Sequence, residues 1–185
     1  LRDLFPETPL QRNEHLSQRY DADIWLKRED LTPVRSYKLR GAFTAMSRVR
    51  AANPAQRQFV CASAGNHAQG VAFACRHFGV EGTIFMPVTT PQQKIDKTRA
   101  FGGDAVRIVL TGDYFDQTLA ASQSFCDEKG AHFLSPFDDA DVILGQSSVG
   151  VEILEQLGQA PDLVILPVGG GGLSSGVTAY LREAA

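Results

Sequence analysis

"DLVILPVGGGGLSSGV", residues 162–177, is the stretch that decides the fold. The apolar run Leu163–Val168 predicts a buried strand, and the pattern from Leu173 onward predicts a helix, so the glycines Gly169–Gly172 form the turn between them. A flexible tether is expected between polar neighbours instead. We therefore expect this turn to be a bare backbone surface that holds a ligand.

Phosphate is the ligand that such a turn is best suited to bind. The N-terminus of a helix offers unpaired N–H groups and the positive end of a dipole, so an anion binds there without a lysine or an arginine. Glycines let the backbone approach the anion and let its N–H groups converge.

Other known glycine motifs match this turn less well. The nucleotide P-loop needs a lysine where this chain has Leu173, and the dinucleotide fingerprint needs a glycine where Ser174 or Ser175 stands. The stretch Gly172–Gly176, "GLSSG", matches the nucleophile elbow of serine hydrolases, but no histidine follows His132 to complete a triad. A hydrolase with Ser174 as nucleophile, and a tight turn without a ligand, stay open as alternatives.

Apolar residues along the chain alternate between short β-branched runs and longer segments of helical period, which is typical of an α/β fold with parallel sheets. The expected strands are Ile24–Lys27, Gln58–Ala62, Thr83–Met86, Ala105–Val109, His132–Leu134 and Leu163–Val168. The expected helices are Ser36–Ala51, Asn66–Phe78, Pro91–Phe101, Tyr114–Lys129, Val142–Leu157 and Leu173–Ala185.

The composition favours a globular protein that acts on small molecules. Hydrophobic residues make up 43% and charged residues 21% of the 185, as in ordinary globular domains. The net charge is −3 with scattered basic residues, which argues against binding to nucleic acid or to an anionic membrane. The sequence has no apolar run of about 18 residues and no signal-peptide pattern, so we expect a cytoplasmic protein.

The cysteines predict neither a disulfide framework nor a metal site. Cys61, Cys75 and Cys126 are odd in number and widely spaced. The group formed by Cys61, His67, Cys75 and His77 lacks zinc-finger spacing. We expect core cysteines, because free cysteine is among the most buried residue types.

A second turn, "VRSYKLRGA" at residues 34–42, places Lys38 in the first turn of a helix with Ser36 as its expected N-cap. A cation is unfavourable beside the positive end of a helix, and desolvation there favours the neutral amine that forms a Schiff base. A solvated surface lysine is the alternative.

A third turn, "SAGNHAQG" at residues 63–70, opens another helix with Ser63, Gly65 and Asn66 exposed at its N-terminal end. Backbone N–H groups with a hydroxyl and an amide form a neutral nest for a carboxylate. His67 is either an acid or base, or a helix-face residue that hydrogen-bonds locally. Ligands of open α/β folds collect outside the carboxyl ends of strands, so the three turns are expected to form one site.

A Schiff-base lysine, a carboxylate nest and a phosphate cradle are what pyridoxal phosphate and an α-amino acid require. On these motifs the sequence resembles fold type II pyridoxal-phosphate enzymes, and most closely the threonine dehydratases. The resemblance runs from "TPL" at residues 8–10 through "WLKREDLTPVRSYKLRGA", "CASAGNHAQGVA" and "VGGGGL". It implies a tryptophan-synthase-β-like α/β fold of two parallel-sheet domains, with residues 1–53 and 137–185 in the large cofactor-binding domain and residues 54–136 in the small domain.

The resemblance also implies a role for each motif residue. Lys38 would form the Schiff base with pyridoxal 5'-phosphate, Asn66 would bind its 3-hydroxyl, and Phe137 would lie against the site. Phosphate binding is implied for Gly169, Gly170, Gly171, Gly172 and Leu173. The loop for the substrate carboxylate would comprise Ser63, Gly65, Asn66 and His67. No metal is implied.

The implied reaction is the elimination that converts L-threonine to 2-oxobutanoate and ammonia, the first step of isoleucine biosynthesis, with L-serine as a second substrate. Serine racemases resemble this loop but have serine as the opposite-face acid/base where this chain has Ala64, which favours elimination over racemisation. A serine dehydratase or racemase of the same fold, and a protein that binds ligand without turnover, are the alternatives. The family resemblance implies a homo-oligomer, either a dimer or a tetramer.

The catalytic region of this family is longer than 185 residues, so we expect the chain to be part of a larger protein. The large domain would then lack part of its sheet, and the residue that faces the pyridine nitrogen would lie outside the chain. We expect an incompletely covered apolar surface around Leu163–Val168 as a result.

Overall fold

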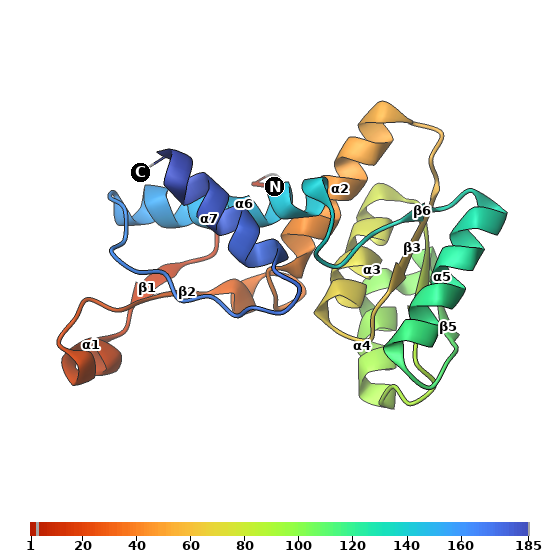
Figure 1. Ribbon diagram of the computed structural model, residues 1–185, viewed down its shortest axis with the longest axis horizontal. Coiled ribbons are helices and arrows are strands. Elements are labelled where there is room, and N and C mark those ends of the chain that lie inside the picture. Colours follow the sequence, from red (N-terminus) through yellow and green to blue (C-terminus); the bar gives the residue numbers. More distant parts are fainter. Residues whose placement is uncertain (3, 185) are drawn as a thin grey trace.

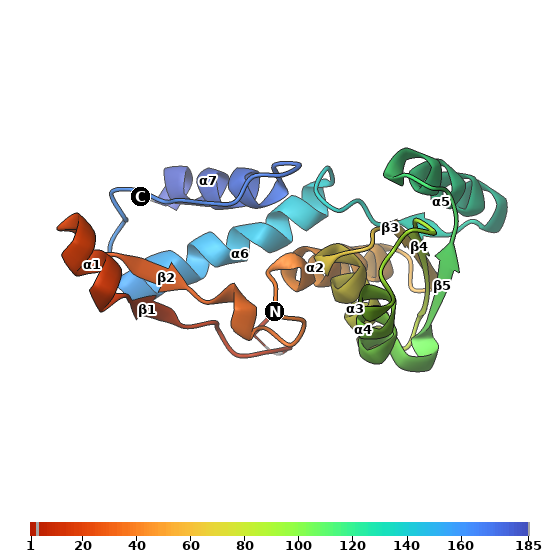
Figure 2. The same ribbon diagram turned by 90° about the horizontal axis from the view of Figure 1, so that it is seen from below.

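The computed structural model describes residues 1, 2 and 4–184, and its two halves differ in architecture (Figure 1). One half contains a four-stranded sheet with its helices. The other contains two long helices beside a two-stranded antiparallel sheet (Figure 2). The strands are β1 (Leu10–Arg12), β2 (Trp25–Lys27), β3 (Gln58–Ala62), β4 (Glu81–Met86), β5 (Val106–Leu110) and β6 (His132–Phe133). The helices are α1 (Glu14–Tyr20), α2 (Lys38–Ala52), α3 (Asn66–Phe78), α4 (Gln92–Gly102), α5 (Phe115–Lys129), α6 (Ala140–Leu157) and α7 (Gly172–Ala184), with short 3₁₀ turns η1 (Glu29–Leu31) and η2 (Gly103–Ala105).

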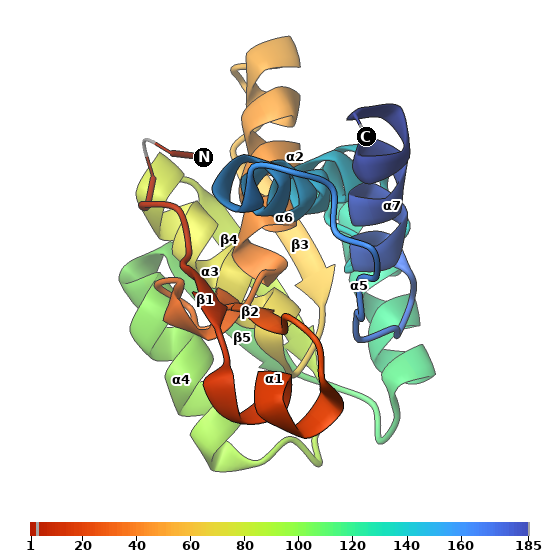
Figure 3. The ribbon, with the colours of Figure 1, turned by 90° about the vertical axis from the view of Figure 1, so that its left-hand side faces the viewer.

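The four-stranded sheet is parallel, with strand order β5-β4-β3-β6. Successive side chains of β3 point to opposite faces, as strand geometry requires. Phe59 and Cys61 belong to the core cluster that includes α3, whereas Val60 and Ala62 pack with residues of α5. Helices α3 and α5 therefore cover opposite faces of the sheet (Figure 3). The predicted α/β fold with a parallel sheet is confirmed.

Most predicted elements are present with ends shifted by one or two residues. Strand β3 and helix α3 have the predicted bounds. Residue 185, the predicted last residue of the final helix, lies outside the described residues. The short elements β1 and α1 were not predicted. The domain division at residues 54–136 stays a prediction.

The predicted strand at Leu163–Val168 is wrong, because this segment belongs to neither sheet of the described chain. Val164 and Leu166 pack against the cluster between α6 and α7, while Leu163 and Ile165 are 76% and 86% exposed. The alternation of a strand is therefore present, but no neighbouring strand supplies hydrogen bonds or covers the outer face. The expected apolar surface around this segment is confirmed.

Ser36 does not cap α2, contrary to the prediction. The helix begins at Lys38 with Tyr37 in the N-cap position and no side-chain cap. The Thr32 hydroxyl accepts a hydrogen bond from Ser36 N and donates one to Ser36 O, both at 2.9 Å. Arg35 has a positive φ of 60°. This turn holds the Ser36 backbone away from the capping position and directs the chain into α2 at Lys38.

Helix α2 connects the two halves because it packs against both α6 and α3. Its crossing with α6 is a contact of backbone with backbone. A Cβ added at Gly145 would lie 2.5 Å from the Arg40 carbonyl oxygen and 2.6 Å from Gly41 Cα. Glycine at this position therefore sets how closely α6 approaches the helix that starts with Lys38.

Two glycines of α6 should respond oppositely to alanine. Gly145→Ala should lower the free energy of unfolding by about 1–3 kcal/mol, because the added methyl forces two backbones apart. A Cβ at Gly150 would meet its nearest atoms at an ordinary 3.4 Å, so Gly150→Ala should be neutral or stabilising by up to about 1 kcal/mol. Urea unfolding of both variants measures the difference, and equal effects would contradict the close crossing.

Cys61 and Cys75 are buried in the sheet core, as predicted, and Cys126 is half-buried on α5. Burial raises the pKa of Cys75 to about 12, so its thiol stays protonated. Within residues 1, 2 and 4–184, no group of three or more His, Cys, Asp or Glu side chains could hold a metal ion. No helix in the described part of the chain has the length and apolar character needed to cross a membrane.

Candidate active site

Lys38 is the first residue of α2, and its side chain reaches the segment between β6 and α6. Its amine donates a hydrogen bond to the Pro136 carbonyl at 2.5 Å, and lies 5.4 Å from the centre of the Tyr37 ring. Burial lowers the pKa of Lys38 below that of a free lysine. The amine is therefore restrained by a neutral acceptor and is more readily deprotonated than a surface lysine, as the sequence predicted.

The glycine turn forms the N-terminus of α7, which begins at Gly172. Gly171 has a φ of 88°, a conformation that favours glycine. The Gly171 carbonyl accepts hydrogen bonds from Ser175 N at 2.8 Å and from the Ser174 hydroxyl at 2.9 Å. The Ser174 proton is thus donated to a backbone carbonyl rather than to an imidazole, which removes support for the serine hydrolase. The first N–H groups of α7 have no intrahelical acceptor and can bind an anion.

Phe137 lies directly against the glycine turn. A Cβ added at Gly170 would overlap the Phe137 ring, and one at Gly172 would come within 3.0 Å of the Phe137 carbonyl oxygen. Around Gly169, in contrast, no atom of the described residues, its two chain neighbours aside, lies within 4 Å of the position a Cβ would take. The turn is therefore packed on the side of Phe137 and open at Gly169, and Leu173 is buried beside it between α6 and α7.

The carboxylate loop lies at the start of α3. Gly65 is the N-cap and makes no side-chain cap, Asn66 is exposed, and the Ser63 hydroxyl accepts a hydrogen bond from Gly65 N at 3.2 Å. The N-terminal N–H groups of α3 are consequently free of side-chain caps. His67 is buried, and its ring Nε2 lies 3.0 Å from the Leu134 carbonyl oxygen.

The three turns converge on the linking segment, which we define as residues Leu134–Phe137. Leu134 accepts from His67 of α3, Pro136 accepts from Lys38 of α2, and Phe137 packs on the glycine turn before α7. The expectation that the three turns form one site is consistent with these contacts. Sequence reasoning named Phe137 but missed Leu134 and Pro136, because both act through backbone carbonyls that leave no signal in side-chain identity.

The residues present fit pyridoxal phosphate. The cofactor needs an amine that can be neutral, an opening for its phosphate, and a place for the carboxylate of an amino acid. Lys38 has a lowered pKa, the backbone at Gly169 is open, and Asn66 and the α3 N-terminus are exposed. All three features border the same short segment.

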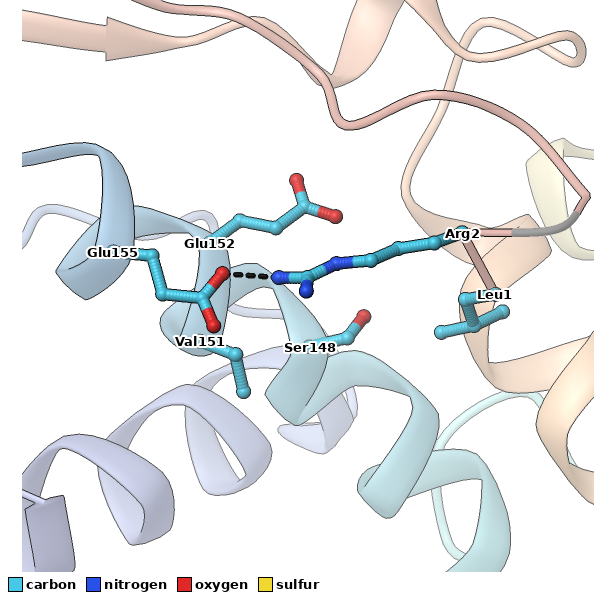
Figure 4. A pocket seen from close by; sticks show the side chains of 6 residues that line it. All are labelled: Leu1, Arg2, Ser148, Val151, Glu152 and Glu155. Carbon is cyan, nitrogen blue, oxygen red and sulfur yellow. Dashed lines mark hydrogen bonds and ion pairs between the residues drawn. The ribbon is translucent and has the colours of Figure 1, made fainter.

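A shallow cavity of about 340 Å³ lies away from these turns, between the N-terminal segment and α6 (Figure 4). Its lining residues are Leu1, Arg2, Ser148, Val151, Glu152 and Glu155. Arg2 pairs with both Glu7 and Glu155, so the charges at its rim are already matched. No residue of the three turns lines it, and we assign it no role.

The fold and the three turns point to the class of pyridoxal-phosphate-dependent enzymes, and the comparison with known families agrees. The match to the family described as "Pyridoxal-phosphate dependent enzyme" extends over residues 1–185, and the chain belongs to that family.

Among individual proteins, the chain is similar to threonine dehydratases. It is 49% identical over 183 residues to "L-threonine dehydratase biosynthetic IlvA" of Bacillus subtilis, covering 99% of this chain and 43% of that protein. The processed form of threonine deaminase isoform 2 from Solanum lycopersicum superposes with a TM-score of 0.91 at 43% identity, covering 99% of this chain and 49% of that one. Maize serine racemase superposes with a TM-score of 0.88 at 27% identity, covering 96% and 52%. The chain thus spans about half or less of the length of these relatives.

Proposed function

We propose that the complete protein is a threonine ammonia-lyase that converts L-threonine to 2-oxobutanoate and ammonia and accepts L-serine as a second substrate. The observation that carries this proposal is the convergence of Lys38, the α3 N-terminus and the glycine turn on one linking segment. The similarity to threonine dehydratases supports the choice of substrate. The reaction would serve isoleucine biosynthesis.

Each proposed role follows from the chemistry of the residue. When bound, pyridoxal phosphate supplies an aldehyde that bonds an amine and a ring that takes up negative charge. Lys38 would hold the cofactor, and its amine would take the α-proton of the substrate. The N–H groups of residues Gly169–Leu173 would bind the phosphate, and Asn66 would bind the 3-hydroxyl. The loop of Ser63, Gly65, Asn66 and the His67 backbone would orient the substrate carboxylate.

Elimination is favoured over racemisation by one position in this loop. Racemisation needs a second group that delivers a proton to the opposite face of the substrate. Ala64 stands beside Gly65 at the α3 opening, and its methyl group can neither give nor take a proton. Loss of the β-hydroxyl needs no proton donor on the opposite face of the substrate. Elimination is then the outcome that this chain supports.

Absorbance and reductive labelling test the proposal. Adding pyridoxal phosphate should produce a visible absorption band, and borohydride should fix the cofactor on Lys38, identified by peptide mapping. Lys97, exposed on α4, is the matched control and should stay unlabelled. The complete protein should then form 2-oxobutanoate from L-threonine. A label on another lysine would contradict the site, and labelling of Ser174 by a fluorophosphonate would favour a hydrolase.

We also propose a cytoplasmic homo-oligomer, a dimer or a tetramer. Membership of the pyridoxal-phosphate enzyme family, for which the resemblance implies a homo-oligomer, supports this proposal. Light scattering of the complete protein gives the number of subunits directly.

A further inference from the structure

His67 has an unusual position for a residue in a binding loop. It is the second residue of α3, next to the exposed Asn66, yet only 3% of it is exposed to solvent. Its Nε2 atom lies 3.0 Å from the Leu134 carbonyl oxygen. The imidazole therefore spans from α3 to the linking segment, and its buried ring is engaged there.

The hydrogen bond fixes the form of the imidazole. A carbonyl oxygen only accepts, so Nε2 must carry the proton and Nδ1 is a bare acceptor. Nδ1 is buried and has no hydrogen-bond partner in the described structure. The pKa of His67 is lowered to about 4, chiefly by burial; the bond to Leu134 opposes the shift and the nearby Lys38 amine adds to it. A ring that stays neutral at neutral pH is suited to hold a backbone in place rather than to exchange protons.

The carbonyl that His67 holds lies two residues before the carbonyl that holds Lys38. Pro136 accepts from the Lys38 amine at 2.5 Å, and the next residue, Phe137, packs on the glycine turn. A displacement of Leu134 would be passed on through this short segment, because proline restricts its backbone. It would move the acceptor of Lys38 and the packing surface of the glycine turn together.

We propose that His67 is a positioning residue for Lys38: its Nε2–H group fixes the linking segment, and the segment places the Lys38 amine relative to the glycine turn. The proposal deepens the proposed function and rests on it for its importance to catalysis. In this proposal the His67 side chain does not bind the substrate carboxylate. Only the backbone N–H of His67 would contribute to carboxylate binding.

Two amide substitutions separate these roles. Glutamine places its side-chain nitrogen near the position of Nε2, whereas asparagine reaches only as far as Nδ1. His67→Gln should keep the hydrogen bond to Leu134. His67→Asn should lose it, although asparagine carries the same amide group as glutamine. Competitive acetylation of Lys38 against Lys97 over a pH series, read by mass spectrometry without cofactor, measures the pKa of Lys38 in each variant.

In His67→Asn the pKa of Lys38 should rise toward that of a free lysine, because burial lowers it in the parent chain and a released segment admits water. The apparent Kd for pyridoxal phosphate should increase about tenfold, since the released segment no longer holds Phe137 against the glycine turn. In His67→Gln both quantities should stay near the parent values. An unchanged Lys38 pKa in a folded His67→Asn variant would overturn the proposal.

A measurement on the unmodified chain guards against variants that fail to fold. Nitrogen NMR of labelled histidine should show His67 as the neutral Nε2–H tautomer from pH 5.5 to 8. An Nδ1–H tautomer, or a charged ring at pH 6, would overturn the proposal. Because neither the acetylation nor the NMR needs cofactor, a failure to bind pyridoxal phosphate would count against the proposed function without deciding the role of His67.

Discussion

Replacing Lys38 by alanine should abolish covalent attachment of pyridoxal phosphate and lower the turnover of L-threonine by the complete protein by at least about 10²–10⁴-fold, the range for loss of a positioned general base alone. The Lys38 amine is the group that would both hold the cofactor and take the α-proton. Its restraint by the Pro136 carbonyl and its lowered pKa suit it to these roles. The measurement is kcat for 2-oxobutanoate formation together with the visible absorption band.

The fold should survive the Lys38→Ala substitution, so the loss of activity can be distinguished from a general loss of structure. Lys38 ends in a hydrogen bond to a neutral carbonyl, and its removal leaves no buried carboxylate unpaired. Unfolding of Lys38→Ala in urea should therefore differ from the parent by about 1 kcal/mol or less. Lys97→Ala, on the exposed face of α4, should retain both the band and the turnover. A Lys38→Ala protein that still forms 2-oxobutanoate at the parent rate would exclude the proposed mechanism.

The sheet and its helices could be predicted from local sequence because each element buries its own apolar face. Strand β3 and helix α3 show this most clearly, since both have the predicted bounds. The failure at Leu163–Val168 has the opposite cause. Its alternation specifies which side chains face α6 and α7, but a strand also requires a partner, and no described strand pairs with it.

The site could be predicted as far as its chemistry is carried by side chains. Lys38, Asn66 and the glycine turn could be proposed from the sequence because an amine, an amide and a run of glycines are visible in it, and their roles stay predictions. The linking segment was not found, since the carbonyls of Leu134 and Pro136 belong to every residue type. The burial of His67 was also hidden, because its ring is turned by a contact 67 residues away in the chain.

A buried ion network was likewise not predicted, although two of its members, Lys27 and Glu29, lie in the motif "WLKRED". Arg40 of α2 is fully buried and donates to Glu29 at 2.8 Å and to Glu152 of α6 at 2.6 Å. Lys27 of β2 pairs with the same Glu152 at 2.7 Å, and the Thr8 hydroxyl donates to Glu29 at 2.6 Å. The network therefore ties the N-terminal segment and the β1–β2 sheet to the crossing of α2 with α6.

Arg40→Met should lower the free energy of unfolding at pH 7 by about 3–5 kcal/mol, because it leaves Glu29 without its guanidinium and Glu152 with Lys27 alone. Arg48→Met is the matched control. Arg48 also joins α2 to α6, through Asp141 at 2.7 Å, but its side chain is 59% exposed, so its loss should cost about 1 kcal/mol or less. Urea unfolding of the two variants measures the difference between a buried and an exposed pair in the same helix crossing.

The cost of Arg40→Met should shrink in acid. Burial alone would raise the pKa of Glu152, but hydrogen bonds from Arg40 and Lys27 outweigh it, so the pKa lies below the ordinary 4.5. A lowered carboxyl pKa stabilises the fold above the ordinary value, and that stabilisation is lost as the pH falls through the folded pKa. In Arg40→Met, protonation of the buried Glu152 carboxylate removes its unpaired charge and so stabilises the variant. The unfolding free energies of the parent chain and of Arg40→Met should therefore approach each other below about pH 4.5. A difference that stays constant from pH 7 to pH 3.5 would show that Arg40 acts through packing rather than through charge.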